Sequence, residues 1–207
     1  IRKHKYQPLS LFQFNQAIKN GEPVPPKHVV FTIDDGFADQ FEIAAPLFNH
    51  YDIPFTCFLI SDFIDKNIWP WDDQLKYILQ NTQRQEFEVT LTNGEKFKVD
   101  FKQGSRESTI RQLRCRVKKA PQDNIYDWLT QLYTLAEVDQ PSQIPSEYQP
   151  MSWSQAQQLI NQGHDIGPHT MSHRILSQLS DNNAKAEIEE SFSRTQQMLN
   201  GSKSVFA

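Results

Sequence analysis

Two short clusters of side chains in this sequence have the residue types and spacing needed for hydrolytic chemistry. Asp34 and Asp35 stand next to each other before Gly36, and His169 and His173 stand four residues apart. Two imidazoles and one carboxylate can hold a zinc ion and leave a coordination position open for water. The other carboxylate can stay charged beside the cation and act as a general base toward that water. These residues predict a metal-assisted hydrolytic site.

Each cluster also has an ordinary structural explanation. Asp-Gly is common turn chemistry, and an aspartate at the end of a strand is often only a cap. A pair of histidines is often found on a surface or in a satisfied core. The location of the clusters favours function, because each follows a predicted strand, and ligand sites of α/β proteins gather at the carboxyl ends of strands.

The acid pair is predicted to lie at the end of a buried strand. The apolar run 29–33 leads into the acids, a helix is predicted from 39 to about 50, and the run 53–60 is typical of a second buried strand. A strand, a helix and a further strand in this order build a parallel sheet. Successive side chains of an extended strand point in opposite directions, so the pair must stand where the backbone turns, and Gly36 permits that turn.

The same α/β pattern precedes the histidine pair. Ser152 is a predicted N-cap for a helix over 153–162, and a short strand over 164–167 follows Gly163. Pro168 then permits the start of a helix, on which residues four positions apart share one face. Both pairs are therefore expected on the same edge of one sheet.

The middle of the chain interrupts this pattern. A helix is predicted over 71–79, with Asp72 and Asp73 in its first turn, where negative charge stabilises the helix dipole. Alternating apolar residues over 86–101 surround Asn93-Gly94, a strong β-hairpin signal. Ser10 is a predicted N-cap for a helix over 11–18. Other helices are predicted over 106–118, 124–137 and 183–200, and a last strand over 203–207.

These segments define the expected domain organisation. A first α/β part covers 1–66, an inserted helix-and-hairpin subdomain covers 67–149, and the α/β domain continues over 150–207. Trp69 and Trp71 stand at the start of the insertion. They could line a sugar site by stacking or anchor the insertion to the core.

The composition excludes several function classes. The chain has 207 residues, a formal net charge of -4 and scattered basic residues, so we expect no nucleic-acid partner. No apolar run approaches the roughly 20 residues of a membrane helix. Cys57 and Cys115 are expected to be free thiols. The sequence begins at Ile1 without an export signal, so we expect it to start inside a longer gene product; its compartment and oligomeric state stay open.

Two motifs resemble those of the metal-dependent polysaccharide deacetylases, carbohydrate esterases of the nodulation-factor and chitin deacetylase type. The family signature Thr-Phe-Asp-Asp-Gly is similar to residues 32–36, Thr-Ile-Asp-Asp-Gly, and the signature His-Ser/Thr-x-x-His is similar to residues 169–173, His-Thr-Met-Ser-His. The resemblance covers about residues 24–62 and 150–207. It implies an α/β fold, a distorted (β/α) barrel that is incomplete at both ends of this sequence.

The resemblance also implies a role for each site residue. Asp34 would be the general base, and Asp35, His169 and His173 would bind one divalent ion, expected to be zinc, with iron, cobalt or nickel as alternatives. The implied reaction removes N-acetyl groups from a carbohydrate, usually the N-acetylglucosamine units of a bacterial polysaccharide. The family's oxyanion motif and general-acid histidine are expected after Ala207, so no residue of this sequence is assigned to them.

Three functions remain open from the sequence. The leading expectation is a carbohydrate N-deacetylase. The same metal site could instead hydrolyse O-acetyl esters or a small cyclic amide. The third alternative is a metal-binding or carbohydrate-binding domain without catalysis.

Overall fold

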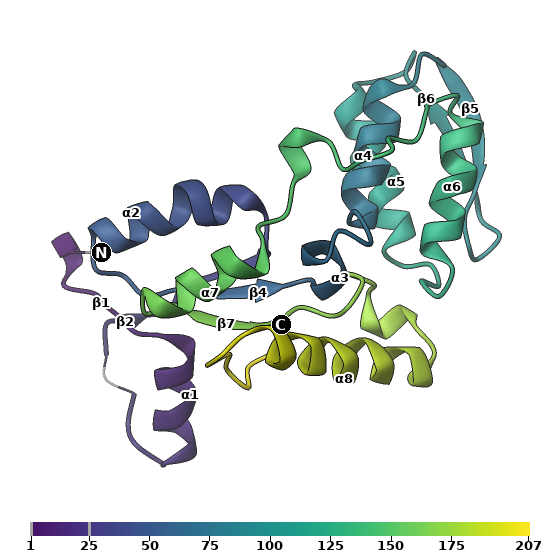
Figure 1. The fold of residues 1–207 in the computed structure, drawn as a ribbon. Helices are drawn as coiled ribbons and strands as arrows, with labels where there is room; N and C mark the ends of the chain where they lie inside the picture. The colour runs from purple at the N-terminus through teal and green to yellow at the C-terminus, as the bar shows by residue number, and fades with distance from the viewer. Residues whose placement is uncertain (1, 25) are drawn as a thin grey trace. The chain divides into compact units, whose positions relative to one another are not determined.

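The computed structural model describes residues 2–24 and 26–207. Figure 1 labels most of the helices and strands. In chain order the elements are η1 (Arg2–His4), β1 (Gln7–Pro8), α1 (Leu11–Lys19), β2 (His28–Val29), β3 (Thr32–Asp35), η2 (Gln40–Ala44), α2 (Ala45–His50), β4 (Thr56–Leu59), α3 (Ser61–Ile64), α4 (Trp71–Asn81), β5 (Glu86–Thr90), β6 (Lys96–Asp100), α5 (Arg106–Val117), α6 (Ile125–Leu135), η3 (Ser146–Tyr148), α7 (Trp153–Asn161), β7 (Asp165–Pro168), η4 (Leu176–Gln178) and α8 (Asp181–Met198).

The chain divides into two compact units. Unit 1 holds the described residues up to Ile68 together with Glu147–Ser172 and Ile188–Ala207, and unit 2 holds Trp69–Ser146 and His173–Glu187. Each unit has its own hydrophobic core. Within the described part of the chain, no helix is both long enough and apolar enough to cross a lipid bilayer.

A parallel sheet forms the centre of unit 1. Its strands lie in the order β3-β4-β7, and every pairing is parallel, so the predicted α/β class is confirmed. Asp35 pairs with Leu59 of β4, and Leu59 pairs with Pro168 of β7. The acid pair and the end of β7 therefore lie on the same edge of this sheet, as the sequence predicts.

The predicted strand over 29–33 is in fact divided between two sheets. β2 pairs in parallel with β1, whereas β3 pairs with β4. Val30 and Phe31 belong to neither strand and connect β2 to β3. β3 extends past the predicted end at residue 33, so Asp34 and Asp35 are the last two residues of the strand.

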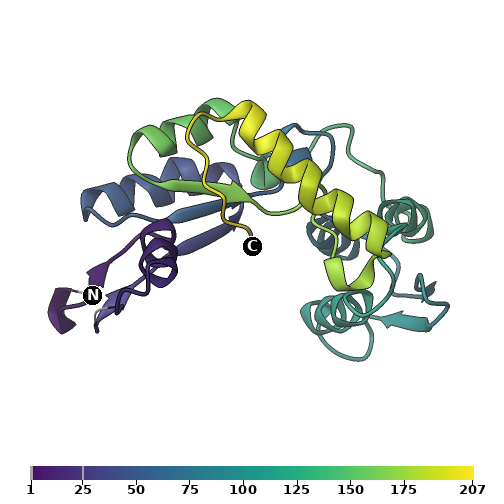
Figure 2. The same cartoon turned by 90° about the horizontal axis from the view of Figure 1, so that it is seen from below.

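Helices α2 and α7 cover one face of this sheet. Figure 2 shows them next to each other, and Nδ2 of Asn49 donates a hydrogen bond to Oε1 of Gln162 at 2.9 Å. Apolar side chains of both helices and of the strands form one core, namely Ala45, Phe55, Cys57, Leu59, Ala156, Leu159 and Ile166. The helix predicted from residue 39 begins as the π-helix η2 and becomes α-helical only at Ala45.

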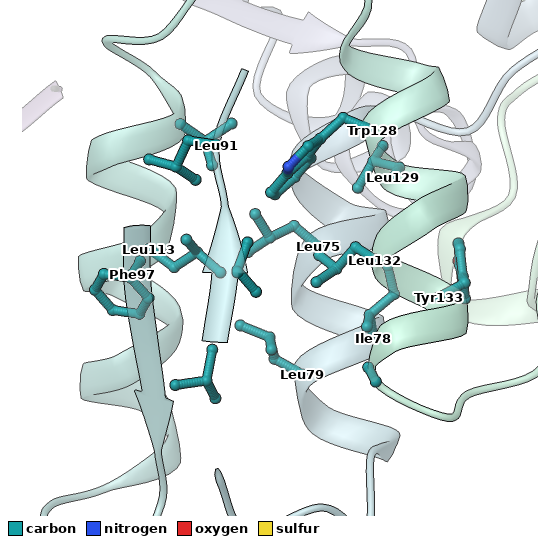
Figure 3. Packing of buried hydrophobic residues seen from close by; sticks show 14 of the residues in the cluster. Leu75, Ile78, Leu79, Leu91, Phe97, Leu113, Trp128, Leu129, Leu132 and Tyr133 are labelled. Atoms are coloured by element: carbon teal, nitrogen blue, oxygen red, sulfur yellow. The ribbon is translucent and has the colours of Figure 1, made fainter. Parts of the chain in front are cut away.

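Unit 2 packs a hairpin against three helices. β5 and β6 pair in antiparallel fashion around Asn93-Gly94, which confirms the predicted hairpin. Side chains from both strands and from α4, α5 and α6 point toward one another, among them Leu75, Leu91, Leu113 and Trp128 (Figure 3). Each fully buried side chain of this size stabilises the fold by about 1.5–3 kcal/mol.

Local signals at other positions give mixed results. Ser10 and Ser152 each form the predicted helix cap, in both cases as a capping box with a glutamine three residues later. The predicted strand over 203–207 is wrong, since no strand is assigned to these residues. They do run along β7, where the amide of Lys203 donates to the carbonyl of Ile166 at 2.8 Å, but the next bond, from Ala207 to Pro168, is 3.4 Å long. The ladder is therefore too irregular to form a strand.

Candidate metal centre

The histidine pair lies on a loop and not on the helix that its four-residue spacing permits. β7 ends at Pro168, and the next helical turn is η4, which begins at Leu176. Thr170 has a φ of +65° and His173 a φ of +59°. Left-handed backbone at these two positions is incompatible with a right-handed helix. Neither residue is a glycine, and backbone of this kind in other residues is concentrated at functional sites.

The end of β4 holds this loop in place. The amide of His169 donates to the carbonyl of Leu59 at 2.8 Å. The next two loop carbonyls, of Thr170 and Met171, accept from the first amides of α3 at 3.2 and 2.9 Å. The first amides of a helix have no partner inside that helix. The loop carbonyls accept hydrogen bonds from these amides, and the same hydrogen bonds fix the path of the loop. His169 is therefore attached to β4, the central strand of the sheet, whose residues are all buried.

The acid pair sits on an equally constrained turn. Asp35 has a φ of +82° and Gly36 a φ of +92°. A Cβ atom at Gly36 would meet side-chain carbons of Leu59 and Ile64 at 2.8 Å each. Only glycine fits this position without displacing the core, which explains the residue after the acids.

Gln40 braces the turn, and nothing in the sequence pointed to it. Its Nε2 donates to the carbonyl of Asp34 at 2.5 Å, and its Oε1 accepts from the amide of Gly36 at 3.2 Å. The thiol of Cys57 also donates to this Oε1, at 3.3 Å. Burial raises the pKa of Cys57, and the nearby charges of Asp34 and Asp35 raise it further, so the thiol stays protonated. Cys57 is thus a buried core residue, and its thiol is free, as predicted.

Three of the four predicted site residues converge. Asp35, His169 and His173 each offer a ligand atom, and these atoms lie within 4.8 Å of one another. Nε2 of His169 is 3.5 Å from Oδ1 of Asp35, and both side chains are largely buried, with 19 % and 27 % of their surface exposed. In the part of the chain that the structure describes, this is the one such group of histidine, cysteine and acidic side chains. We call it the Asp-His-His cluster.

The chemistry of the cluster fits a divalent metal ion. Nδ1 of His169 lies 2.8 Å from the backbone carbonyl of Ala207, which can accept only from a protonated Nδ1. That tautomer leaves the lone pair on Nε2, the nitrogen that faces Asp35. A ring nitrogen held by a backbone carbonyl is the usual support of a metal-binding histidine. Two nitrogens and one oxygen suit zinc, and also other first-row transition metals.

Asp34 lies outside the cluster. Its side chain is exposed, and it precedes Asp35, whose left-handed φ of +82° interrupts the regular alternation of side chains along β3. The carboxylate is thus accessible to solvent, whereas Oδ1 of Asp35 lies 3.5 Å from Nε2 of His169.

The first turn of α4 contains a contact that the sequence did not reveal. Asp72 and Asp73 lie in that turn as predicted, and Oδ1 of Asp72 is also 3.4 Å from Nδ1 of His173. Burial raises the pKa of Asp72, but its hydrogen bond to His173 and the charge of that ring outweigh this effect, so the net pKa is below the ordinary value. Trp69 and Trp71 are only 6 % and 1 % exposed, so the interpretation that they stack on a sugar is wrong.

Comparison with known proteins places the chain in a family. A family model described as polysaccharide deacetylase matches residues 21–92 and 124–207, which include both motifs. The chain belongs to the polysaccharide deacetylase family, whose members are hydrolases. The resemblance seen in the two motifs is therefore confirmed.

Individual proteins resemble this chain only over a short segment or at low sequence identity. Poly-beta-1,6-N-acetyl-D-glucosamine N-deacetylases of Escherichia coli K12 and O157:H7 are each 31% identical over 77 residues, which is 37% of this chain and 11% of theirs. The chain thus spans only a small part of these relatives. A structure of the Streptococcus pyogenes deacetylase PplD in complex with acetate matches with a TM-score of 0.55 and 15% identity, over 99% of this chain and 55% of that one. This likeness supports the fold alone.

Proposed function

We propose that this protein is a metal-dependent N-deacetylase that acts on polymers of N-acetylglucosamine. The observation that carries the proposal is the convergence of Asp35, His169 and His173 within 4.8 Å in a member of the polysaccharide deacetylase family. The substrate is suggested by the curated relatives, whose names specify poly-beta-1,6-N-acetyl-D-glucosamine.

The proposed roles follow from where the side chains point. The three members of the Asp-His-His cluster would hold one divalent ion, with zinc as the first candidate. When bound, such an ion polarises the acetyl carbonyl and acidifies the attacking water. His169 would bind through Nε2, because its Nδ1 is committed to the carbonyl of Ala207.

Asp34 is the proposed general base. It would accept the proton of the water that attacks the acetyl carbonyl, and the reaction would release acetate and leave a free amine on the sugar. Its exposed carboxylate stands next to the ligand Asp35, and Gln40 fixes the backbone between them and the following glycine. Such fixed placement lowers the barrier because the base needs no reorganisation before it acts.

We propose an architecture with more strands than the described residues contain. These residues hold one parallel sheet of three strands and two sheets of two strands. We extend the parallel sheet to the distorted (β/α) barrel that the family resemblance implies. The proposed domain boundaries are those of the sequence analysis, 1–66, 67–149 and 150–207, with the middle segment as an insertion.

Acetate release tests this function directly. The purified protein is treated with a chelator, dialysed, and assayed on N-acetylglucosamine oligomers with and without added zinc. We expect metal-dependent release. Release that survives chelation would refute the metal role, and the absence of release with zinc bound in a one-to-one ratio would refute the N-deacetylase assignment. Parallel assays on O-acetylated xylan oligomers distinguish an esterase.

Variants test the individual roles. His169→Gln should abolish zinc binding, whereas Asp34→Asn should keep zinc and reduce turnover at least 100-fold. Asp39→Asn is the matched control, because it removes an exposed carboxylate from the same segment. Full activity of Asp34→Asn would exclude Asp34 as the base.

A further inference from the structure

We infer that Asp72 is a positioning residue that orients the imidazole of His173 for metal binding. The inference rests on the proposed function, because it takes His173 as a metal ligand. It assigns a role to an acid that the sequence explains fully as a helix-dipole partner.

The first argument is the contact itself. Oδ1 of Asp72 is 3.4 Å from Nδ1 of His173, and the two side chains are only 21 % and 23 % exposed. In the part of the chain that the structure describes, Oδ1 of Asp72 is buried and forms no hydrogen bond of ordinary geometry. A buried carboxylate oxygen is costly unless a donor faces it, and Nδ1 of the ring, 3.4 Å away, would be such a donor when it carries a proton.

The second argument is the resulting state of the ring. A proton on Nδ1, held by the carboxylate, leaves the lone pair on Nε2. The other histidine of the cluster has the same arrangement, with a backbone carbonyl in place of the carboxylate. Both rings would thus present Nε2, and a carboxylate partner also makes that nitrogen a stronger ligand.

The third argument concerns the backbone of His173. Its φ of +59° is unfavourable for a residue with a side chain. Nε1 of Trp71 donates to the carbonyl of His173 at 2.9 Å. Trp71 and Asp72 are neighbours at the start of α4, so one turn of this helix fixes both the backbone and the ring of His173.

Zinc affinity tests the inference without requiring activity. Asp72→Asn keeps the size of the side chain but removes its charge. The amide can also turn its NH2 group toward Nδ1 in place of its oxygen. We expect a 10- to 100-fold loss of zinc affinity, measured by competition with a chromophoric chelator. Asp73→Asn removes the same charge from the same helical turn, and we expect its affinity to stay within about twofold of the wild type. Equal affinity of wild type and Asp72→Asn would overturn the inference.

The tautomer of His173 provides a second measurement that needs no stable variant at Asp72. Long-range ¹⁵N–¹H correlation spectra of the metal-free protein distinguish the two neutral forms, and the signal is assigned by its loss in His173→Gln. We expect the Nδ1-protonated form; a ring protonated mainly at Nε2 would overturn the inference even if Asp72→Asn failed to fold.

His173→Gln also separates this inference from the proposed function. If His173→Gln binds zinc as tightly as the wild type, the proposed metal role of His173 fails, and the inference fails with it. If His173→Gln loses zinc and Asp72→Asn does not, the proposed function stands and only the inference fails.

Discussion

Acid should destabilise this protein through His164, a histidine outside the Asp-His-His cluster. The residue is only 4 % exposed, and its ring lies 4.0 Å from that of Phe55, measured between centroids. Its Nδ1 accepts from the amide of Phe55 at 3.4 Å. A proton on Nδ1 would face that amide proton, so the charged form loses both its solvation and this hydrogen bond. Burial lowers the pKa of His164 to about 4, although the charge of Asp165 acts in the opposite direction.

The sign and size of the effect follow from proton linkage. Well above pH 6.5 the ring is neutral in both the folded and the unfolded state, so its protonation does not change the free energy of unfolding. As the pH falls from about 6.5 to about 4, the unfolded state binds a proton and the folded state does not, so the free energy of unfolding decreases. The full difference in pKa corresponds to a loss of roughly 3 kcal/mol, complete only below pH 4.

Urea unfolding followed by circular dichroism between pH 7 and 4.5 measures this loss. His164→Gln keeps an acceptor for Phe55 but cannot be protonated in this range, so its stability should fall less steeply with pH than that of the wild type. The slope is compared, because the substitution also changes packing at every pH. His50→Gln, at an exposed position, controls for the loss of an imidazole and should follow the wild type. Parallel curves for wild type and His164→Gln would refute the reasoning.

Two further predictions concern stability. Gly36→Ala should lower the free energy of unfolding by about 2–4 kcal/mol, because a Cβ at φ +92° also meets two core side chains. Gly94→Ala, at φ +83° with open space around it, should lower the free energy of unfolding by only about 1 kcal/mol. Equal losses of the two variants in urea unfolding would contradict the packing argument. Arg194→Met should cost about 1–3 kcal/mol at pH 7, because Asp65 loses two hydrogen bonds of 2.7 and 2.8 Å. Those bonds lower the pKa of Asp65, so wild type and variant should converge in stability as the pH falls below the ordinary carboxyl range, and a gap that persists there would contradict this.

The elements with strong local signals were predictable. The hairpin around Asn93-Gly94 and the helices capped by Ser10 and Ser152 form as expected, because turn and cap chemistry act within a few residues. The parallel pairing of β3 with β4 follows from the strand-helix-strand order. Such features depend little on distant parts of the chain.

The features that sequence reasoning missed depend on tertiary context. The left-handed backbone at Thr170 and His173 has no sequence signal, since neither residue is a glycine, so the spacing of four was also compatible with a helix that does not form. The π-helix η2 was missed because its apolar pattern over five residues does not differ visibly from that of an α-helix. The contact of Asp72 with His173 joins residues that are far apart in the sequence, and a helix-dipole explanation already accounted for the acid.

The convergence of the two motifs was predictable for a simpler reason. Both lie at the carboxyl ends of strands that share β4 as their neighbour, so the sheet itself brings them together. The sequence indicated which residues meet. It did not indicate the surrounding contacts, because the hydrogen bonds of Gln40 and Trp71 and the contact of Asp72 with His173 follow no periodic pattern.

The close approach at Gly167 has a consequence for the order of folding. A Cβ atom there would lie 2.5 Å from the carbonyl of Val205, so the segment that ends at Ala207 docks directly on β7. The imidazole of His169 receives its backbone partner from this segment, 38 residues further along the chain. Until the segment docks, the ring can rotate and exchange its proton between the two nitrogens. Under the proposed metal role, we therefore expect high-affinity metal binding only after this segment has docked on β7.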